Sequence, residues 1–380
     1  MSRPTLIVGA GFAARQLIKQ LRKLDAERQI VLVTADSGDD YNKPELSHVI
    51  SQGQTAQQLT RQSLAEFAKA FDITVYPFTP VTHIDTDAHQ LHCGTLRLDY
   101  AQLVLATGAS AIVPPIVGSE LMLTLNSQEE YRQAQTQLKH AQRIFILGGG
   151  LIGTELAMDI QSSGKQVMLA DQCTSLLAAQ LPVEISAHLQ QSLMMMGVEL
   201  YLNQGLKQLV KEGEQVRCTL DNGRQLEVDA VISAIGLKPN IALAQAAGIH
   251  VNKGIVVNAQ LQTNCADIYA LGDCAEIDGK LRPYLQPIQL SALVLAKTLV
   301  GHAATLTLPA MLVRVKTPRF PIQFAGNAHP TTLQWQVSRD SEGIIAKGMD
   351  ETQTLRAFVV SEAKMSLAFT LLKTLTTAVS

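Results

Sequence analysis

The chain has 380 residues, of which 47% are hydrophobic and 17% are charged. This length allows two or three domains with cores of their own, and the composition excludes an intrinsically disordered chain. The formal net charge is −2, so the basic character typical of nucleic-acid-binding proteins is absent. No apolar run reaches the length of a membrane span and no secretory leader is recognised, so we expect a soluble cytoplasmic protein.

Near the N-terminus the sequence predicts a strand, a glycine-rich turn and a helix. The apolar run Thr5-Leu6-Ile7-Val8 precedes Gly9-Ala10-Gly11-Phe12-Ala13-Ala14, and a helix is expected over residues 13–24. The next strand, over residues 30–34, ends close to Asp36. An acidic side chain near this position reaches the adenosine ribose of a bound dinucleotide. The proline in Tyr41-Asn42-Lys43-Pro44 favours a non-helical segment with an extended backbone at Lys43.

The same pattern recurs in the middle of the chain. Ile144-Phe145-Ile146-Leu147 precedes Gly148-Gly149-Gly150-Leu151-Ile152-Gly153, and a second helix is expected over residues 153–163. The strand over residues 166–170 is followed by Asp171. A carboxylate there binds ribose hydroxyls and repels a 2′-phosphate, and residues 172–177 contain no Lys or Arg, so NADH is favoured over NADPH. A solvated acid at a strand end is the alternative.

Both motifs have the form strand, G-x-G-x-x-G/A, helix. The first glycine allows the tight turn, the second lets the backbone approach a pyrophosphate, and the third position lets the helix pack closely on its strand. The phosphates then bind the free N–H groups at the helix N-terminus. Two such motifs in one chain indicate two dinucleotides, as in a flavoprotein that takes hydride from a nicotinamide nucleotide.

The remaining elements complete an α/β pattern. Residues 103–108, 230–236 and 268–272 read as buried strands that end at glycine. Asp221-Asn222-Gly223 predicts a hairpin turn, and hinges are expected at Pro114-Pro115 and Lys238-Pro239-Asn240. A helix begins near Pro287 and ends at Gly301. Beyond residue 308 we expect an antiparallel sheet and a terminal helix over residues 361–375.

The cysteines show no spacing typical of a redox-active pair. Their number, five, is odd, and scattered thiols fit a reducing compartment. We therefore expect no redox-active disulfide.

His89, His92 and Cys93 form a short cluster without further ligands nearby, so we interpret them as surface strand residues and expect no metal site.

Along its whole length the chain resembles the FAD- and NAD-dependent reductases that contain two dinucleotide-binding domains. Two segments are similar to the rubredoxin reductase branch of that family, which includes the bacterial NADH:flavorubredoxin reductases of anaerobic nitric oxide detoxification. The motifs of the whole family are Val8-Gly9-Ala10-Gly11, Ala106-Thr107-Gly108, Gly148 to Glu155, Ala234-Ile235-Gly236 and Tyr269-Ala270-Leu271-Gly272-Asp273. The segments specific to the branch are Tyr41-Asn42-Lys43-Pro44-Glu45-Leu46-Ser47 and Val315-Lys316-Thr317-Pro318.

The resemblance implies an α/β fold with two Rossmann-like domains, similar to glutathione reductase, and a small α+β C-terminal domain. It places an FAD-binding domain at residues 1–113 and 240–308, an NAD-binding domain at 114–239 and the C-terminal domain at 309–380. The implied FAD-binding residues are Gly9, Gly11, Phe12, Ala14, Thr34, Asp36, Lys43, Pro44, Val81, Ala106, Thr107, Gly108, Asp273, Gln286 and Lys316. The implied NAD-binding residues are Gly148, Gly150, Leu151, Ile152, Gly153, Glu155, Asp171 and Gly236.

The resemblance also implies roles for particular groups. Lys43 would lie beside flavin N5 and pair with Glu155, and these two are the catalytic candidates. A solvated lysine and a glutamate that complements the helix dipole are the plainer interpretations. Asp273 would bind the ribityl chain of FAD, and the helix at Pro287 would direct its N-terminus at the flavin and stabilise its anionic reduced form.

The implied reaction is electron transfer from NADH through FAD to flavorubredoxin or another small acidic rubredoxin-type carrier. Arg15, Lys19, Arg22 and Lys23 recur at helical spacing. They predict either a solvated helix face or a docking surface for that carrier. An NADH oxidase of the same fold and a non-catalytic redox sensor are the alternatives.

Overall fold

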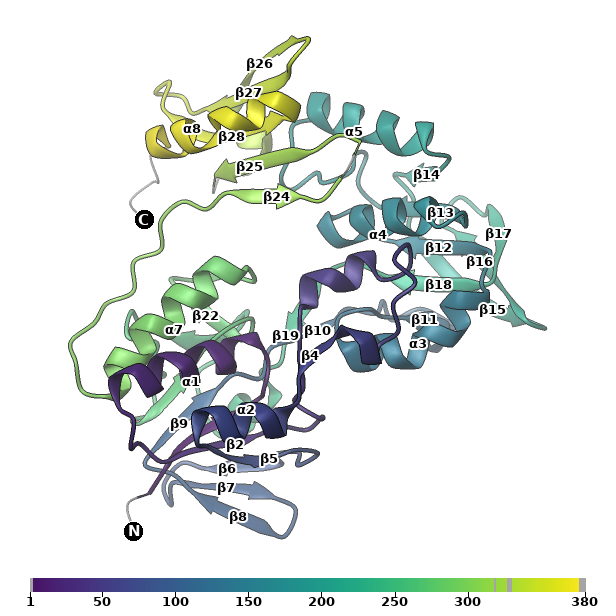
Figure 1. Cartoon of the computed structure of the whole chain (residues 1–380). Helices are drawn as coiled ribbons and strands as arrows, with labels where there is room; N and C mark the ends of the chain where they lie inside the picture. Colours follow the sequence, from purple (N-terminus) through teal and green to yellow (C-terminus); the bar gives the residue numbers. More distant parts are fainter. Residues whose placement is uncertain (1–2, 318, 327–329, 376–380) are drawn as a thin grey trace. The chain divides into compact units, whose positions relative to one another are not determined.

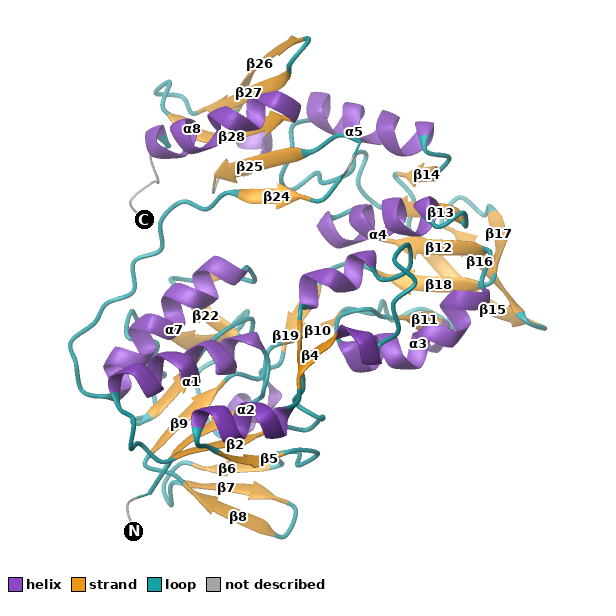
Figure 2. Cartoon of the chain, viewed as in Figure 1, coloured by secondary structure: helices purple, strands orange, loops and turns teal. Residues whose placement is uncertain are grey.

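The computed structural model describes residues 3–317, 319–326 and 330–375. The chain divides into two compact units and passes between them several times (Figure 1). Unit 1 comprises residues 1–42, 60–110 and 237–308, and unit 2 comprises residues 43–59, 111–236 and 309–380. Helices and strands alternate through much of the chain, and strands dominate near the C-terminus (Figure 2).

Unit 1 is built on a parallel sheet. Its strands are β1 (Thr5–Val8), β2 (Ile30–Val33), β5 (Thr74–Tyr76), β9 (Gln102–Leu105) and β21 (Ile268–Ala270). They pair in the order β21-β9-β1-β2-β5. All four residues of β1 are buried, because the continuous apolar run of a parallel strand is covered on both faces. The helices of this unit are α1 (Phe12–Leu24), α2 (Leu64–Phe71), α6 (Ala242–Ala246) and α7 (Leu285–Leu299).

Smaller sheets accompany this core. One antiparallel group consists of β6 (His83–Asp85), β7 (Gln90–Cys93) and β8 (Leu96–Asp99). His92 and Cys93 lie in β7, whereas His89 lies in the turn before it. Cys93 is buried, whereas His92 is partly exposed, and no group of three or more His, Cys, Asp or Glu in the described residues could hold a metal ion. The other short strands are β3 (Asp40–Tyr41), β4 (Thr60–Gln62), β10 (Ala109–Ala111), β19 (Leu237–Pro239), β20 (Ile255–Val257), β22 (Ala275–Ile277) and β23 (Lys280–Leu281).

The first helix does not present a basic stripe to solvent, so that interpretation is wrong. Arg15 is 3% exposed. Its guanidinium donates to the Gly38 carbonyl at 2.6 Å and lies 4.3 Å from the ring centre of Phe67. Burial lowers the pKa of Arg15. Arg22 donates to backbone carbonyls of Phe71 and Arg28 at 2.6 and 2.7 Å, so it fastens the end of the helix to neighbouring loops.

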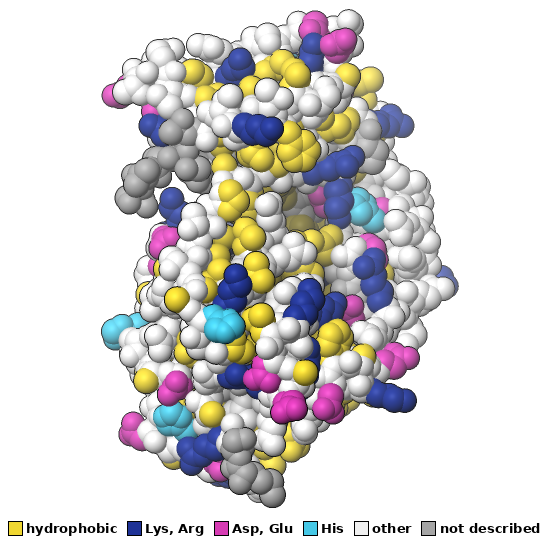
Figure 3. All heavy atoms as spheres, turned by 60° about the vertical axis from the view of Figure 1, so that its left-hand side comes forward, with side chains coloured by type: hydrophobic (Ala, Val, Ile, Leu, Met, Phe, Trp, Pro, Cys, Tyr) yellow, Lys and Arg dark blue, Asp and Glu magenta, His cyan; other side chains and the backbone are white. Residues whose placement is uncertain are grey.

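Lys and Arg side chains are also dispersed elsewhere. On the face drawn in Figure 3 they are interspersed with acidic and uncharged side chains. Of the four basic residues of the first helix, Lys23 is exposed, Lys19 and Arg22 are partly buried and Arg15 is buried. The described part of this helix therefore does not expose the row of basic side chains that a docking surface for an acidic carrier would need.

Unit 2 contains a second parallel sheet. Its strands are β11 (Met122–Leu123), β12 (Arg143–Leu147), β13 (Gln166–Asp171), β14 (Glu199–Leu202) and β18 (Ala230–Ser233). They pair in the order β11-β18-β12-β13-β14. The helices here are α3 (Gln128–His140), α4 (Leu151–Ser162) and α5 (Val183–Met195). An antiparallel group, β15 (Leu206–Glu212), β16 (Gln215–Leu220) and β17 (Gln225–Val228), contains the predicted hairpin at 221–223.

The C-terminal part of unit 2 is the predicted antiparallel sheet. Its strands are β24 (Val313–Val315), β25 (Ile322–Gly326), β26 (Gln334–Asp340), β27 (Gly343–Met349) and β28 (Leu355–Ser361). The terminal helix is shorter than predicted, because α8 spans Ala368–Thr374 and a 3-10 helix, Glu362–Leu367, precedes it. Glu362 has a φ of 51°, which an α-helix does not accommodate. Pro318 lies outside the described residues.

One short segment of unit 2 is inserted between two strands of unit 1. The strands β3 and β4 pair with each other, and residues 43–59 between them belong to unit 2. This segment, called the 43–59 segment below, begins with a 3-10 helix over Lys43–His48. The predicted non-helical backbone is therefore correct at Tyr41 and Asn42 and wrong at Lys43, because proline is tolerated in the first turn of a helix.

Among the described residues, no helix combines the length and apolar character that crossing a bilayer requires.

Replacing Arg22 with Ala should lower the free energy of unfolding by about 2 kcal/mol, because the carbonyls bound by its guanidinium lose a charged donor. The matched control is Lys23→Ala on the same helix, whose exposed side chain should contribute little. Urea unfolding of both variants measures the difference. Equal stability of the two variants would contradict the structural role of Arg22.

Candidate cofactor-binding sites

The first glycine turn has the geometry that a dinucleotide requires. Gly9 has a φ of 103°, and a Cβ added there would lie 2.3 Å from the Ala106 carbonyl oxygen. A Cβ added at Gly11 would meet nothing within 4 Å, so the turn is open at this position. Ala14 is fully buried, as expected for the small residue at which the helix packs on its strand.

The second glycine turn repeats these features. Gly148 has a φ of 113°, and a Cβ there would lie 2.5 Å from the Ala234 carbonyl oxygen. A Cβ at Gly153 would lie 1.9 Å from the Gly148 carbonyl oxygen, whereas one at Gly150 would meet nothing within 4 Å. Each turn therefore closes tightly at its first glycine and leaves open space at its second.

Helices α1 and α4 begin directly at these open glycines. Gly11 and Gly150 are their N-cap residues, and neither cap makes a side-chain hydrogen bond within the part of the chain that the structure describes. The first turns of both helices carry no acidic residue. The N–H groups and the positive end of each helix dipole can therefore receive a phosphate.

The two predicted ribose-binding acids differ in their local structure. Asp171 is the last residue of β13, and its carboxylate accepts the N–H groups of Gly149 at 2.5 Å and Cys173 at 2.6 Å. Asp36 lies beyond the end of β2 and accepts from Thr34 Oγ1 at 2.6 Å and the Gly38 N–H at 3.0 Å. Asp171 is therefore held against its glycine turn, whereas Asp36 stabilises a turn of its own.

The turn at Ala106-Thr107-Gly108 is tied to the second predicted hinge. Thr107 Oγ1 donates to the Asn240 carbonyl at 2.8 Å, and Asn240 Nδ2 donates back to the Thr107 carbonyl at 2.8 Å. The Asn240 N–H donates to the Gly108 carbonyl at 2.9 Å. Both ends of this contact lie within unit 1, so the hinge is rigid on that side. Asn240 was not predicted as a site residue, although its place in the hinge Lys238-Pro239-Asn240 signals it.

The other predicted FAD residues of unit 1 lie in loops and first turns. Asp273 follows β21 in the turn before β22, and the buried Cys274 is next to it. Burial raises the pKa of the Cys274 thiol, so this thiol is not an activated nucleophile. Phe12 and Gln286 lie in the first turns of α1 and α7, and Val81 is partly buried beside the core.

Glu155 connects three segments of unit 2. Its side chain is 6% exposed. Oε2 accepts from Ser47 Oγ at 2.9 Å, and Oε1 accepts from the Lys316 backbone N–H at 3.0 Å. Lys316 Nζ in turn donates to the Pro44 carbonyl at 2.8 Å. Glu155, the 43–59 segment and the C-terminal sheet thus share one hydrogen-bonded group.

The structure therefore separates the predicted residues into two sets. Every predicted NAD-binding residue lies in unit 2. Most predicted FAD-binding residues lie in unit 1, but Lys43, Pro44 and Lys316 lie in unit 2. Sequence reasoning missed Ser47 as a partner of Glu155 and also missed Asp159. A signal for Asp159 was present, since it lies four residues after Glu155 in a largely apolar helix.

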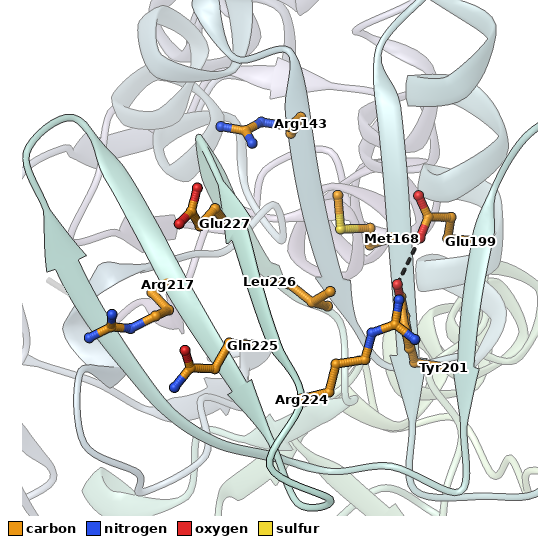
Figure 4. A pocket seen from close by; sticks show the side chains of 9 residues that line it. All are labelled: Arg143, Met168, Glu199, Tyr201, Arg217, Arg224, Gln225, Leu226 and Glu227. Carbon is orange, nitrogen blue, oxygen red and sulfur yellow. Dashed lines mark hydrogen bonds between the residues drawn. The ribbon is translucent and has the colours of Figure 1, made fainter.

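A separate hollow of about 530 Å³ lies in unit 2 (Figure 4). Its lining comes from β12, β13, β14, β16 and β17 and the turn before β17. Arg143 is the first residue of β12, so the hollow is distinct from the glycine turn that follows the end of that strand. Arg143 pairs with Asp229 and Arg217 with Glu212, while Arg224 lies over the Tyr201 ring. Its arginines already have partners, so we assign no ligand to it. The residues that line it are Arg143, Met168, Glu199, Tyr201, Arg217, Arg224, Gln225, Leu226 and Glu227.

Comparison with known protein families gives two matches. Residues 3–292 match the family model described as pyridine nucleotide-disulphide oxidoreductase. The chain belongs to the pyridine nucleotide-disulphide oxidoreductase family. Residues 305–375 match a second model, the rubredoxin binding C-terminal domain. The predicted α/β fold with two Rossmann-like domains and a small C-terminal domain is confirmed.

Curated members of this oxidoreductase family resemble the chain over its whole length. Proteins named nitric oxide reductase FlRd-NAD(+) reductase from Escherichia coli O81 (strain ED1a) and Salmonella heidelberg (strain SL476) are 55% and 56% identical over 375 residues. Each alignment covers 99% of this chain and 100% of the relative.

Solved structures of more distant proteins share the fold. A ferredoxin reductase from Rhodopseudomonas palustris has a TM-score of 0.89 at 22% identity and covers 99% of this chain and 96% of its own. A water-forming NADH oxidase from Lactobacillus brevis bound to NADH has a TM-score of 0.90 at 17% identity and covers 99% of this chain and 92% of its own. At these identities the likeness concerns the fold alone.

The two open glycines provide a paired test of the cofactor sites. Their backbone φ values of −68° at Gly11 and −77° at Gly150 suit any residue, so Gly11→Val and Gly150→Val should both fold. Gly11→Val should lose FAD, because the side chain fills the phosphate space. Gly150→Val should keep FAD and bind NADH roughly tenfold or more weakly, a change of about 1.4 kcal/mol.

Flavin absorbance of the purified variants and titration with NADH measure these effects, and each variant is the control for the other. Full FAD content in Gly11→Val would show that the first turn does not bind the flavin nucleotide.

Proposed function

We propose that the protein is an FAD-dependent oxidoreductase that transfers electrons from NADH to the rubredoxin centre of flavorubredoxin and so supports nitric oxide reduction. The observation that carries this proposal is the combination of two open glycine turns with a rubredoxin-binding C-terminal domain in one chain. The full-length likeness to flavorubredoxin-NAD(+) reductases supports the choice of acceptor.

The chain's own residues bind and orient the two nucleotides. When bound, FAD would supply the redox chemistry that links a two-electron donor to a one-electron acceptor. The turn at Gly9 and Gly11 with helix α1 holds the FAD pyrophosphate, and Asp36 and Asp273 bind its sugar groups. The positive end of the α7 dipole, near Pro287, would stabilise negative charge on a bound flavin.

The nicotinamide side uses residues of unit 2. The turn at Gly148 and Gly150 with helix α4 holds the NADH pyrophosphate, and Asp171 binds its adenosine ribose. Glu155 and Lys43 orient the groups between which hydride passes. This role requires fixed positions, and the buried Glu155, held by the Ser47 hydroxyl and the Lys316 N–H, meets that requirement.

The proposed domain organisation follows the same logic. Residues 1–113 and 240–308 form the FAD-binding domain, 114–239 the NAD-binding domain and 309–380 the C-terminal domain. The proposed location is the cytoplasm, which the five free cysteines support. None of them is placed as a redox pair, and this favours direct electron transfer from the flavin.

An NADH oxidase of the same fold is the second candidate. Enzymes of that kind carry a redox cysteine where this chain has Asn42 and Lys43, so this candidate ranks lower. Steady-state NADH oxidation with oxygen, peroxide, rubredoxin, ferredoxin and a thiol disulfide separates the candidates. Rubredoxin should be reduced fastest, and faster turnover with oxygen or the disulfide would overturn the proposal.

NADH should be preferred over NADPH because of the charge on Asp171. In Asp171→Asn an oxygen remains to accept the Gly149 N–H, but the repulsion of the 2′-phosphate disappears. The ratio of kcat/KM for NADH to that for NADPH should fall roughly tenfold, as expected for loss of a repulsion on the order of 1 kcal/mol. Asp229→Asn is the control, because the Asp229 carboxylate accepts the Arg143 N–H at the start of β12, away from the glycine turn. An unchanged ratio in Asp171→Asn would assign the discrimination to another residue.

A further inference from the structure

A second buried carboxylate of α4 binds the backbone of the 43–59 segment. Asp159 is 6% exposed and lies one helical turn after Glu155. Its Oδ2 accepts the N–H groups of Ile50 and Ser51, each at 3.2 Å, and its Oδ1 accepts from the Ser51 hydroxyl. His48 Nδ1 lies 3.9 Å from Oδ1. A buried carboxylate needs donors of this kind, because desolvation of the charge is otherwise costly.

Helix α3 holds the far end of the same segment. Tyr131 donates its hydroxyl to the Gln54 carbonyl at 2.6 Å. Gln128 Nε2 donates to the Ala56 carbonyl at 2.6 Å, and Gln135 Oε1 accepts the Ala56 N–H at 3.0 Å. Residues 49–56, between its 3-10 helices Lys43–His48 and Gln57–Leu59, have no regular structure, so these side chains satisfy backbone groups that a loop would otherwise expose.

The position of Lys43 thus depends on helix α4. Lys43 is the first residue of the 3-10 helix that ends at His48, and the chain after it is bound by Glu155 through Ser47 and by Asp159 through Ile50 and Ser51. Helix α4 itself begins at the open Gly150 turn. One rigid element therefore carries both the nucleotide-binding end and the two carboxylates that hold the Lys43 turn.

We propose that Asp159 is a positioning residue for hydride transfer, which acts by holding the 43–59 segment so that Lys43 keeps its productive place. This inference rests on the proposed transfer from NADH to FAD. Asp159 itself touches neither nucleotide in this role. A hydrophobic residue could fill the same volume, but it could not bind the two N–H groups that fix the register of the segment.

The main variant is Asp159→Leu, which fills a similar volume and removes the oxygen that accepts the Ile50 and Ser51 N–H groups. Flavin reduction by saturating NADH, measured by stopped-flow absorbance, should slow about tenfold, as expected for a small misplacement of a group at the reacting centre. The Kd for NADH and the FAD content should stay unchanged. The control is Ser162→Ala on the same helix, whose hydroxyl donates only to its own helix at Met158; its rate should equal that of the unaltered protein.

A double-mutant cycle with Lys43→Met distinguishes positioning from a general structural effect. If Asp159 acts through Lys43, then Asp159→Leu should slow the Lys43→Met protein much less than it slows the unaltered protein. An equal fold-loss in both backgrounds, or no loss in Asp159→Leu alone, would overturn the inference.

If Asp159→Leu does not fold, Ser51→Ala removes the hydroxyl contact to the same carboxylate and enters the same cycle with the same criteria. If NADH does not reduce the flavin of the unaltered protein, the proposed function fails and not the role of Asp159. Faster hydrogen exchange at the Ile50 and Ser51 amides in the Asp159 variant reports loss of the contact independently of activity.

Discussion

In both glycine turns the first glycine lies directly against a backbone carbonyl at the end of a neighbouring parallel strand. The partner of Gly9 is Ala106, and the partner of Gly148 is Ala234. These approaches leave no room for a side chain, so the turn closes and the helix begins where its N–H groups can receive a phosphate. The sequence motifs Ala106-Thr107-Gly108 and Ala234-Ile235-Gly236 are thus equivalent elements of the two halves.

This constraint explains why so much of the fold is readable from sequence. Each motif joins an apolar strand to a helix at a fixed offset, and the strand order of both parallel sheets is consistent with that reading. The hairpin at Asp221-Asn222-Gly223 and the helix at Pro287 were predictable for the same reason, since turn and cap residues act on their immediate neighbours.

Contacts between residues distant in the chain were not predictable in this way. Helical spacing places Arg15 and Arg22 on one face, but only the fold brings the carbonyls of Gly38 and Phe71 to them. The burial of Glu155 and Asp159 likewise arises from a segment more than a hundred residues earlier in the sequence. A proline beside Lys43 was a misleading local signal, because the 3-10 helix is stabilised by these distant partners.

The chain leaves unit 1 after residue 110 and re-enters it at residue 237, and the pairing of these two points affects how the protein folds. Strand β10 leads out of this unit and β19 leads back, and the two pair with each other. Hydrogen bonds from Ile112 to Gly236 and from Asn240 to Gly108 extend this pairing on both sides.

The parallel pairing of β9 with β21 joins residues from either side of this long insertion. With the insertion unfolded, that pairing would have to close a very long loop, whose entropic cost slows the formation of non-local sheets. Once the insertion has folded and its ends are held together, the effective loop is short. The order of assembly that follows is the parallel sheet of unit 2 first and the completion of the unit 1 sheet by β21 afterwards.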